Sequence, residues 1–491
     1  MRKVLVANRG EIALRIIRAY RELGIETVAV YSEADRGALH TRFADESYLL
    51  GPPLPKESYL RGDRIIKLAK ETGCEAIHPG YGFLAENAAF AQAVEESGLA
   101  FIGPTPEALR LMGDKVAARR LAREQGIPTI PGSGPVDSEE ELMKSAKRIG
   151  YPLLLKAALG GGGKGMRIIH EEGELIDSFH RASSEAEAAF ADPTIYLEKF
   201  IPGARHIEFQ VLSDGRGNHV HLGERECSIQ RRYQKLVEES PSPALTSELR
   251  EEMGRAALKI TRACGYRSAG TVEFLYDGEH FYFLEMNTRL QVEHPVTEEA
   301  FRVDIVKLQL AIAAGESLPP SLQGLQPRAH AIECRIYAED PQNNFSPSTG
   351  VVEELVLPAG PGVRVDHGIY RGERITPYYD PLLAKLICWG EDRARAIARM
   401  EQALKEFEIL GVRTTIGFHL KVMGDERFRR GEYDTGFLEG LDLTPELPEE
   451  DLLALAAAAA LGYHRERGGG AKMGKEMEDG WKAYLPWLVK R

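Results

Sequence analysis

The sequence predicts a multidomain protein of the α/β and α+β classes, with a parallel sheet near the N-terminus and a strand-rich region further along the chain. Short apolar runs alternate with helical patterns over residues 2–112, which is typical of βαβ units. A segment rich in Pro and Gly at 126–135 interrupts both patterns and predicts a linker or a domain edge. With 491 residues, the chain is long enough for about three domains.

Each predicted element follows from a local pattern. In the N-terminal region, strands are expected at 4–7, 27–31, 76–78 and 100–102, with helices at 11–23 and 87–97. The next region has expected strands at 153–157 and 195–200 and a helix at 175–190, and strands and hairpins dominate from about 204 to 440. The tail contains an Ala-rich helix-forming run at 452–461. No G-x-G-x-x-G follows the first strand, so a dinucleotide-binding fingerprint is absent.

Composition excludes several classes of protein. Apolar residues make up 43% of the chain, which excludes a disordered protein. The formal net charge of −12 argues against a nucleic-acid or anionic-membrane partner. The five cysteines are scattered without C-x-x-C spacing, which favours reduced thiols over a zinc site or disulfides and predicts a cytoplasmic protein. No signal peptide or membrane span is expected.

The most informative segment is 285–294. If it is extended, side chains alternate between two faces, and one face carries Glu285, Asn287, Arg289, Gln291 and Glu293. Two acids, two amides and a guanidinium suit a metal ion next to an oxyanion. A half-solvated polar strand is the alternative interpretation.

A second acid extends this hypothesis. Residues 271–276 and 281–285 predict a hairpin around Asp277 and Gly278. A two-residue loop would place Glu273 and Glu285 on opposite faces, whereas an odd-length loop or a bulge would place them on the same face. We predict the odd-length loop, which would let the two carboxylates share a cation such as Mg²⁺. Two unrelated strand acids are the alternative.

A glycine run at 159–165 follows the expected strand at 153–157. Consecutive glycines let backbone N–H groups surround phosphate oxygens, and Lys164 adds positive charge. The run is not a Walker A loop, because Ala158 replaces its first Gly and Gly165 replaces its Ser/Thr. A flap that closes over a nucleotide is the better interpretation, and a plain flexible hairpin tip is the alternative.

Two basic features remain. The run at 230–235 is a solvated face, an anion pocket or, with Tyr233 interleaved, a nucleic-acid patch, and the acidic net charge disfavours the last. Arg335 lies in an apolar neighbourhood, where a structural ion pair is its default role.

At these residues the chain resembles biotin carboxylase, the ATP-grasp component of biotin-dependent carboxylases. The resemblance extends from Val4 to about Gly440. It is carried by the segments 7–13, 78–87, 113–115, Lys156 with the glycine loop, 224–228, 285–294 and 379–381. Tyr233 stands where the family commonly has His, so no role is carried over to that position.

The resemblance implies roles for the matching residues. For ATP binding these are Lys115, Lys156, Gly162, Gly163, Lys164, Glu198, Lys199, Ile201, His206 and Gln230. For Mg²⁺ or Mn²⁺ they are Glu273, Glu285 and Asn287. For bicarbonate they are Lys235, Arg289, Gln291, Val292 and Glu293. Glu293 would be the general base and Arg335 would stabilise the biotin enolate, so that Glu293, Arg335, Lys235 and Arg289 form the implied catalytic set.

The resemblance also implies a domain organisation. It implies an ATP-grasp fold with a pre-ATP-grasp domain at 1–112 and a mobile glycine-rich lid domain at 113–203. The ATP-grasp core and strand-rich C-terminal domain would occupy 204–442. The tail at 443–491 would be a partner-docking helix or a solvated extension.

The implied activity is ATP- and Mg²⁺-dependent carboxylation of biotin by bicarbonate, through carboxyphosphate. The tail lacks a Met-Lys-Met sequence, so biotin is expected on a separate carrier protein, and a carboxyltransferase is expected as a further partner. A homodimer is expected because the family forms one. The acceptor stays open among acetyl-CoA, pyruvate, propionyl-CoA and related compounds. The alternatives are another ATP-grasp ligase that joins a carboxylate to an amine, and a regulator that binds nucleotide or biotin without turnover.

Overall fold

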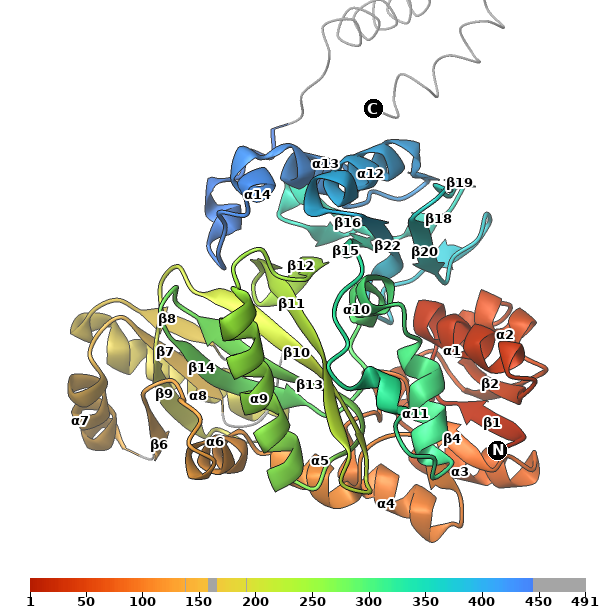
Figure 1. The fold of residues 1–491 in the computed structure, drawn as a ribbon, viewed down its shortest axis with the longest axis horizontal. Helices are drawn as coiled ribbons and strands as arrows, with labels where there is room; N and C mark the ends of the chain where they lie inside the picture. The colour runs from red at the N-terminus through yellow and green to blue at the C-terminus, as the bar shows by residue number, and fades with distance from the viewer. Residues whose placement is uncertain (137, 158–165, 191, 445–491) are drawn as a thin grey trace, which may run out of the picture. The chain divides into compact units, whose positions relative to one another are not determined.

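The computed structural model describes residues 1–136, 138–157, 166–190 and 192–444 (Figure 1). Residues Met1–Leu441 form one compact unit. The glycine run at 159–165 and the Ala-rich run at 452–461 lie outside the described residues. Within the described part of the chain, no helix has both the length and the apolar character needed to cross a membrane.

The N-terminal region is a five-stranded parallel sheet with the strand order β3-β2-β1-β4-β5. Its elements are β1 (Lys3–Val6), α1 (Gly10–Glu22), β2 (Glu26–Ser32), α2 (Leu39–Phe43), β3 (Glu46–Gly51), α3 (Gly62–Glu71), β4 (Ala76–His78), α4 (Ala88–Glu96) and β5 (Ala100–Phe101). Val4 and Val6 face one hydrophobic cluster while Leu5 faces another, so both faces of the sheet are covered. The predicted parallel α/β region is therefore confirmed.

Two helices lead from this sheet to a smaller one. They are α5 (Pro106–Gly113) and α6 (Lys115–Glu124), and α6 is capped by Asp114, whose side chain accepts from the backbone N–H groups of Val116 and Ala117. The antiparallel sheet that follows has the order β6-β9-β7-β8. Its elements are β6 (Gly132–Val136), α7 (Glu139–Ile149), β7 (Leu153–Ala157), β8 (Arg167–Ile169), α8 (Leu175–Phe190) and β9 (Ile195–Lys199).

Of the two interpretations of 126–135, a linker or a domain edge, the linker is wrong for the second half of the segment. Residues Gly132–Val136 form strand β6, which pairs with β9 on one side only. An edge strand tolerates Pro135 because it does not need every backbone N–H for the ladder.

The largest sheet has eight strands in the order β14-β13-β10-β11-β12-β15-β22-β20 (Figure 1). These strands are β10 (Arg205–Asp214), β11 (His219–Arg231), β12 (Gln234–Ser240), β13 (Arg267–Tyr276), β14 (Phe281–Asn287), β15 (His330–Tyr337), β20 (Val363–His367) and β22 (Leu382–Gly390). The accompanying helices are α9 (Ser247–Ala263), α10 (His294–Phe301) and α11 (Ile305–Ala313). All pairings in this sheet are antiparallel, as expected for a strand-rich region with hairpins.

The remaining elements follow β15 in the sequence. They are β16 (Glu339–Asp340), β17 (Ser346–Pro347), β18 (Gly350–Val351), β19 (Glu354–Val356), β21 (Arg374–Ile375), α12 (Arg393–Glu406), β23 (Glu408–Leu410), α13 (Ile416–Gly424) and α14 (Glu426–Arg430). One hydrophobic cluster joins α1 to α10 and α11, including Ile16, Phe301 and Ile305. The N-terminal sheet and the large sheet therefore share part of a core.

The β13–β14 hairpin differs in one respect from its prediction. Tyr276 pairs with Phe281, so the loop has an even number of residues and the predicted odd-length loop is wrong. A register shift follows, because Phe274 pairs with Phe283 whereas Glu273 pairs with Glu285. The bulge at Leu284 places the two glutamates opposite each other on the same face.

The extended conformation proposed for all of 285–294 is also wrong. Strand β14 ends at Asn287, and the chain bends and turns before α10 begins at His294. The polar side chains of this segment meet because the chain bends, and not because they alternate along one strand.

Candidate active site

The centre of the site is a buried ammonium surrounded by carboxylates. Lys235, on β12, donates from Nζ to Glu273 Oε1 and to Glu293 Oε1, both at 2.8 Å, and it also pairs with Glu208. Burial would lower the pKa of Lys235, but the three carboxylates outweigh it and raise the pKa well above its usual range. The side chain therefore stays charged and holds together residues from three different elements.

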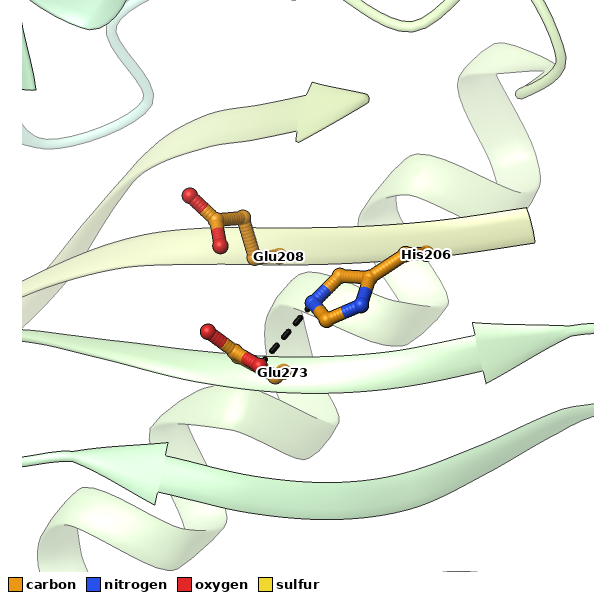
Figure 2. A group of neighbouring side chains, drawn as sticks. All are labelled: His206, Glu208 and Glu273. Carbon is orange, nitrogen blue, oxygen red and sulfur yellow. Dashed lines mark ion pairs between the residues drawn. The ribbon is translucent and has the colours of Figure 1, made fainter. Parts of the chain in front are cut away.

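Glu208 and Glu273 lie directly opposite each other on β10 and β13. Figure 2 shows these two carboxylates with His206, whose ring is directed at Glu273. The Nε2 atom of His206 is 2.9 Å from Glu273 Oε2. One donor atom from each of the three residues lies within 4.8 Å of the others, which makes this group a candidate for binding a metal ion.

Glu293 lies in the turn that directly precedes α10 and is fully buried. Its Oε2 accepts a hydrogen bond of 3.1 Å from Nη2 of Arg335, a residue of β15. Burial would raise the pKa of Glu293, but Lys235 and Arg335 hold it well below its usual range. Glu293 is therefore ionised at neutral pH, as a general base must be.

Arg335 also pairs with a second carboxylate, that of Glu238. Its Nε donates to Glu238 Oε1 at 2.6 Å, and Glu238 is also fully buried. Burial raises the pKa of Glu238 to about 7, because Arg335 compensates its charge only in part and Glu293 is nearby. The ion pair expected for Arg335 as a default is present, and one of its two partners is the candidate base.

Glu285 and Asn287 reach the same side of the hairpin as Glu273. Asn287 Nδ2 donates to Glu273 Oε1 at 2.8 Å, and Lys115 Nζ is 3.8 Å from Glu285 Oε2. Three side chains that the sequence suggested as metal ligands therefore meet around one edge of the sheet, with Lys115 beside them.

Arg289 and Gln291 lie in the bend after β14. Arg289 donates to Gln291 Oε1 at 2.9 Å and to Asn287 Oδ1 at 3.0 Å, and Gln291 donates to Glu273 Oε1 at 3.1 Å. Arg289 also donates to Glu86 Oε2 at 2.9 Å. The bend is thus tied both to the β13 carboxylate and to the N-terminal region.

A second group lies on the smaller sheet. Lys156 Nζ is 2.6 Å from Glu198 Oε2, and Arg119 contacts the other carboxylate oxygen at 2.7 Å. Burial would raise the pKa of Glu198, but these two cations lower it. Lys199 donates to the carbonyl groups of Gly150 and Tyr151, at 3.0 and 2.6 Å.

The remaining candidates are distributed as follows. Gln230 donates to the carbonyl of Cys227 at 2.8 Å and lies 3.0 Å from His206 Nδ1. Ile201 is half-buried in the loop after β9, and the Val292 carbonyl accepts from Lys385 at 2.8 Å. Gly162, Gly163 and Lys164 lie outside the described residues.

Sequence reasoning missed several residues at the site. Glu208 could have been found, because His206, Glu208 and Gln210 alternate with apolar residues along β10. Glu238 and Lys385 give no such local signal. Each lies in a buried strand, and its polar partner is distant in the sequence.

Comparison with known proteins assigns the fold to a class. Residues 114–321 match the model described as carbamoyl-phosphate synthase L chain, ATP binding domain. Residues 1–109 match the biotin carboxylase N-terminal domain, and residues 333–440 match the biotin carboxylase C-terminal domain. The three matches and the arrangement of sheets define an ATP-grasp protein.

Individual relatives narrow this class. The chain is 54% identical over 446 residues to biotin carboxylase 1 of Bacillus subtilis, covering 90% of this chain and 99% of that protein. It is 50% identical over 469 residues to the small subunit of 2-oxoglutarate carboxylase from Hydrogenobacter thermophilus, covering 94% of this chain and 99% of that protein. The chain belongs to the biotin carboxylase family.

Solved structures agree with this assignment. One is the dimeric biotin carboxylase domain of Hydrogenobacter thermophilus 2-oxoglutarate carboxylase, in complex with MgADP, ADP and bicarbonate. It has a TM-score of 0.87 at 52% identity, covering 89% of this chain and 97% of that one. A biotin carboxylase from Campylobacter jejuni in complex with a β-γ-ATP compound also has a TM-score of 0.87, at 46% identity. The ATP-grasp fold inferred from the sequence is confirmed.

Proposed function

We propose that this protein is a biotin carboxylase, a ligase that uses ATP to form a C–N bond between bicarbonate carbon and biotin. The single observation that carries the proposal is the Glu293 carboxylate held between Lys235 and Arg335. It provides a buried, ionised base between two cations, which is what deprotonation and alignment of a small oxyanion require.

Bicarbonate binds in this proposal among Lys235, Arg289, Gln291, Val292 and Glu293. Bicarbonate is a poor nucleophile until it loses its proton, so Glu293 accepts that proton. Lys235 and Arg289 hold the resulting anion in line with the γ-phosphate of ATP, because phosphoryl transfer depends mainly on positioning and charge neutralisation.

The bicarbonate oxygen then attacks the γ-phosphorus of ATP, which breaks the bond to the β-phosphate, forms carboxyphosphate and releases ADP. The breakdown of carboxyphosphate releases CO₂ and leaves phosphate, which takes the ureido proton of biotin. The deprotonated ureido nitrogen then attacks CO₂ and forms the C–N bond. Arg335 stabilises the biotin oxyanion, since a preorganised donor is most effective where negative charge develops. The contact of Arg335 with both Glu238 and Glu293 supports this role, because it fixes the guanidinium beside the base.

ATP binding is proposed for the residues on the smaller sheet and the adjoining strands. Lys115 and Lys156 face the phosphates, together with Gly162, Gly163 and Lys164 of the lid. Glu198, Lys199 and Ile201 hold the adenine, and His206 and Gln230 contact ribose or phosphate. The contacts of Lys156 with Glu198 and of Gln230 with His206 support this grouping.

The residues present fit a magnesium ion. Glu273, Glu285 and Asn287 offer carboxylate and amide oxygens on one face of the hairpin, and such oxygens are the ligands that Mg²⁺ accepts, as does Mn²⁺. The bound ion would supply charge neutralisation for the phosphates of ATP. Glu208 and His206 lie next to this set and hold Glu273 and Lys235 in place.

We propose that biotin arrives on a separate carrier protein, and that a carboxyltransferase and a second copy of this chain complete the assembly in the cytoplasm. The domains proposed for this chain are 1–112, 113–203, 204–442 and a tail at 443–491. The acceptor is a 2-oxo acid or an acyl-CoA. Relatives named as subunits of 2-oxoglutarate carboxylase and of mitochondrial methylcrotonoyl-CoA carboxylase support this range, because both align over more than nine-tenths of this chain.

The decisive experiment measures ADP release with ATP, Mg²⁺, bicarbonate and free biotin. In wild-type protein, ADP release should depend on bicarbonate and be stimulated by biotin. In Glu293→Gln the rate of ADP release should fall ~10²–10⁴-fold, while nucleotide binding is retained. Glu224→Gln is the matched control, since Glu224 is equally buried but pairs with Arg250 away from the site.

Two results would contradict the proposal. If active wild-type protein shows no biotin stimulation but consumes ATP when an amine is supplied, the chain is a different ATP-grasp ligase. If it binds nucleotide or biotin and never turns over, it is a regulator.

A further inference from the structure

Lys385 is a buried lysine that the proposed reaction does not use. It lies on β22, has no exposed surface, and is the register partner of Arg335 on the neighbouring strand β15. Residues directly opposite each other in an antiparallel pair project from the same face of the sheet. Lys385 and Arg335 therefore extend in the same direction, toward the turn that carries Glu293.

The two cations bind consecutive residues of that turn. Lys385 Nζ donates to the backbone carbonyl of Val292 at 2.8 Å, and Arg335 Nη2 donates to the Glu293 carboxylate at 3.1 Å. One contact fixes the main chain before Glu293, and the other fixes its side chain. Because the side chain of Glu293 starts from the main chain that Lys385 holds, a shift of the Val292 carbonyl would displace the carboxylate.

A carboxylate from the N-terminal region anchors Lys385. Glu11, in the first turn of α1, places Oε2 3.3 Å from Lys385 Nζ and accepts a hydrogen bond from Tyr81. Both charged side chains are almost fully buried. Burying an ammonium group is unfavourable unless it is paired, so the Glu11 carboxylate offsets part of the cost of burying Lys385.

The backbone around this pair is closely packed. A Cβ atom on Gly368 would lie 2.7 Å from the backbone nitrogen of Glu11, so no larger residue fits there without movement. The start of α1 is therefore held directly against the loop after β20. This contact limits how far Glu11, and with it Lys385, can shift.

We propose that Glu11 and Lys385 are positioning residues for the general base: Glu11 holds Lys385, and Lys385 holds the Val292 carbonyl so that Glu293 meets bicarbonate in the right place. The inference rests on the proposed function, because it assigns the pair to the bicarbonate step. Neither residue touches the reacting atoms, and both act through the turn at Val292 and Glu293.

The test separates bicarbonate use from nucleotide use. Lys385→Met keeps the length of the side chain and removes its charge and its donor. At saturating ATP we expect kcat/KM for bicarbonate to fall ~10–100-fold, because a displacement of about 1 Å at a reacting group costs up to ~10²-fold. The KM for ATP should stay within about twofold of the wild-type value, because the described residues proposed to bind nucleotide do not contact Lys385 and the effects of changes at independent sites are additive.

Glu11→Gln provides a second, milder variant. It keeps the shape of the side chain and weakens the anchor of Lys385, so the same bicarbonate-specific loss should appear at ~3–10-fold. The double variant Glu11→Gln/Lys385→Met should be no worse than Lys385→Met alone, because the two residues act as one chain of contacts. If Lys385→Met fails to fold, the kinetics of Glu11→Gln alone still test the proposal.

The matched control is Arg267→Met. Arg267 also joins the large sheet to the N-terminal region, pairing with Glu95 at 2.9 Å and donating to the carbonyl of Gly103, but it touches no site residue. We expect its kinetics to match those of wild type. Calorimetric titration with MgADP checks that every variant binds nucleotide as a folded protein.

The outcomes are distinct. If the bicarbonate constants of Lys385→Met and Glu11→Gln equal those of wild type, or if both variants lose ATP and bicarbonate use in equal measure, the positioning role is wrong and the pair is structural. The same conclusion follows if Arg267→Met reproduces the bicarbonate defect. Wild-type protein without bicarbonate-dependent ADP release would instead overturn the proposed function, and this inference with it.

Discussion

At the scale of single residues, the site is a set of buried carboxylates whose charges are shared among a few cations. Arg335 is the clearest example, because it compensates Glu238 and Glu293 at once. Removing one partner of a buried pair leaves an uncompensated charge, which is far more costly than removing both partners. This asymmetry separates the contribution of Arg335 to stability from its contribution to chemistry.

Arg335→Gln should therefore have two effects. It should lower the free energy of unfolding by ~3–5 kcal/mol, because two buried carboxylates lose a cation. It should also reduce biotin-dependent ADP release by ~10²–10³ while the KM for ATP changes little, because a donor to the developing oxyanion is lost. Chemical denaturation and steady-state kinetics measure the two effects separately.

The double variant Arg335→Gln/Glu238→Gln tests the separation. Neutralising Glu238 removes one of the two carboxylates that lose a cation, so stability should recover in part while activity does not. Recovery of activity together with stability would show that Arg335 acts only through folding.

His419 supplies a prediction about pH. It is fully buried on α13, where Nε2 donates to the carbonyl of Arg335 at 2.7 Å, and burial lowers its pKa to about 4. An unfolded histidine has a pKa of about 6.5. Between these values the unfolded chain binds a proton that the folded chain does not, so this residue makes the protein less stable as pH falls.

His419→Gln keeps a donor for the Arg335 carbonyl and removes the titration. The loss of unfolding free energy between pH 7.5 and 5.5 should be smaller in this variant, by about 1 kcal/mol. His280→Gln, which alters an exposed histidine, is the control. Equal pH dependence in wild type and His419→Gln would contradict the assignment.

The sequence predicts residues of the site well where a local pattern exists. The hairpin brings Glu273 and Glu285 together: strand alternation indicates Glu285 and the expected hairpin indicates Glu273, although a bulge rather than an odd-length loop places them on one face. Contacts between distant segments gave no such signal. Lys235 and Glu208 are 27 residues apart, and Lys385 and Val292 are 93 apart, so only the folded sheet reveals their proximity.

At the scale of elements, backbone irregularities decide where side chains point. The bulge at Leu284 is one case, because regular pairing beyond an even loop would have put Glu285 on the opposite face from Glu273. For Glu273 and Glu285 to lie on the same face, the hairpin needs an irregularity, but an odd-length loop and a bulge would both meet this requirement, and the sequence does not distinguish them. Strand β6 shows the opposite effect. Its Pro and Gly residues predict a break in regular structure, yet pairing with β9 stabilises an edge strand there.

The β11–β12 turn is a second irregularity. Arg231 pairs with Gln234, so the loop consists of Arg232 and Tyr233, and both have positive φ, at 50° and 66°. A two-residue hairpin with this geometry normally uses Asn and Gly. Residues with a Cβ atom are strained there.

Tyr233→Gly should relieve part of this strain. The left-handed conformation costs an L-residue ~1–2 kcal/mol, and the extra flexibility of glycine in the unfolded chain offsets some of it, so stability should rise by about 1 kcal/mol. Tyr378 has the same exposed fraction, 43%, without a positive φ. Tyr378→Gly is therefore the control and should destabilise, and a similar loss in Tyr233→Gly would show that the turn is not strained.

At the scale of the whole molecule, the proposed chemistry depends on regions that are far apart in the sequence but belong to one unit. Residues Met1–Leu441 form that unit, and every residue of the proposed site lies within it. Arg15 of α1 pairs with Glu298 and Asp304, both at 2.9 Å, next to the shared hydrophobic core. The N-terminal sheet and the large sheet are therefore expected to unfold together.

This organisation predicts the effect of shortening the chain. A protein that ends at Leu441 should retain bicarbonate-dependent, biotin-stimulated ADP release, with kcat and the KM values within about twofold of the full chain, because every residue of the proposed site belongs to the unit Met1–Leu441. Its main thermal transition should also be unchanged.

The same two proteins test the role of the tail. If residues 443–491 dock a partner, the full chain should retain a biotinylated carrier or a carboxyltransferase during purification and the shortened chain should not, although both use free biotin equally well. Equal retention would make the tail a solvated extension. Loss of free-biotin turnover or a lower melting temperature in the shortened chain would contradict the claim that Met1–Leu441 is self-sufficient, because an independent unit needs no contact with the tail to form its site.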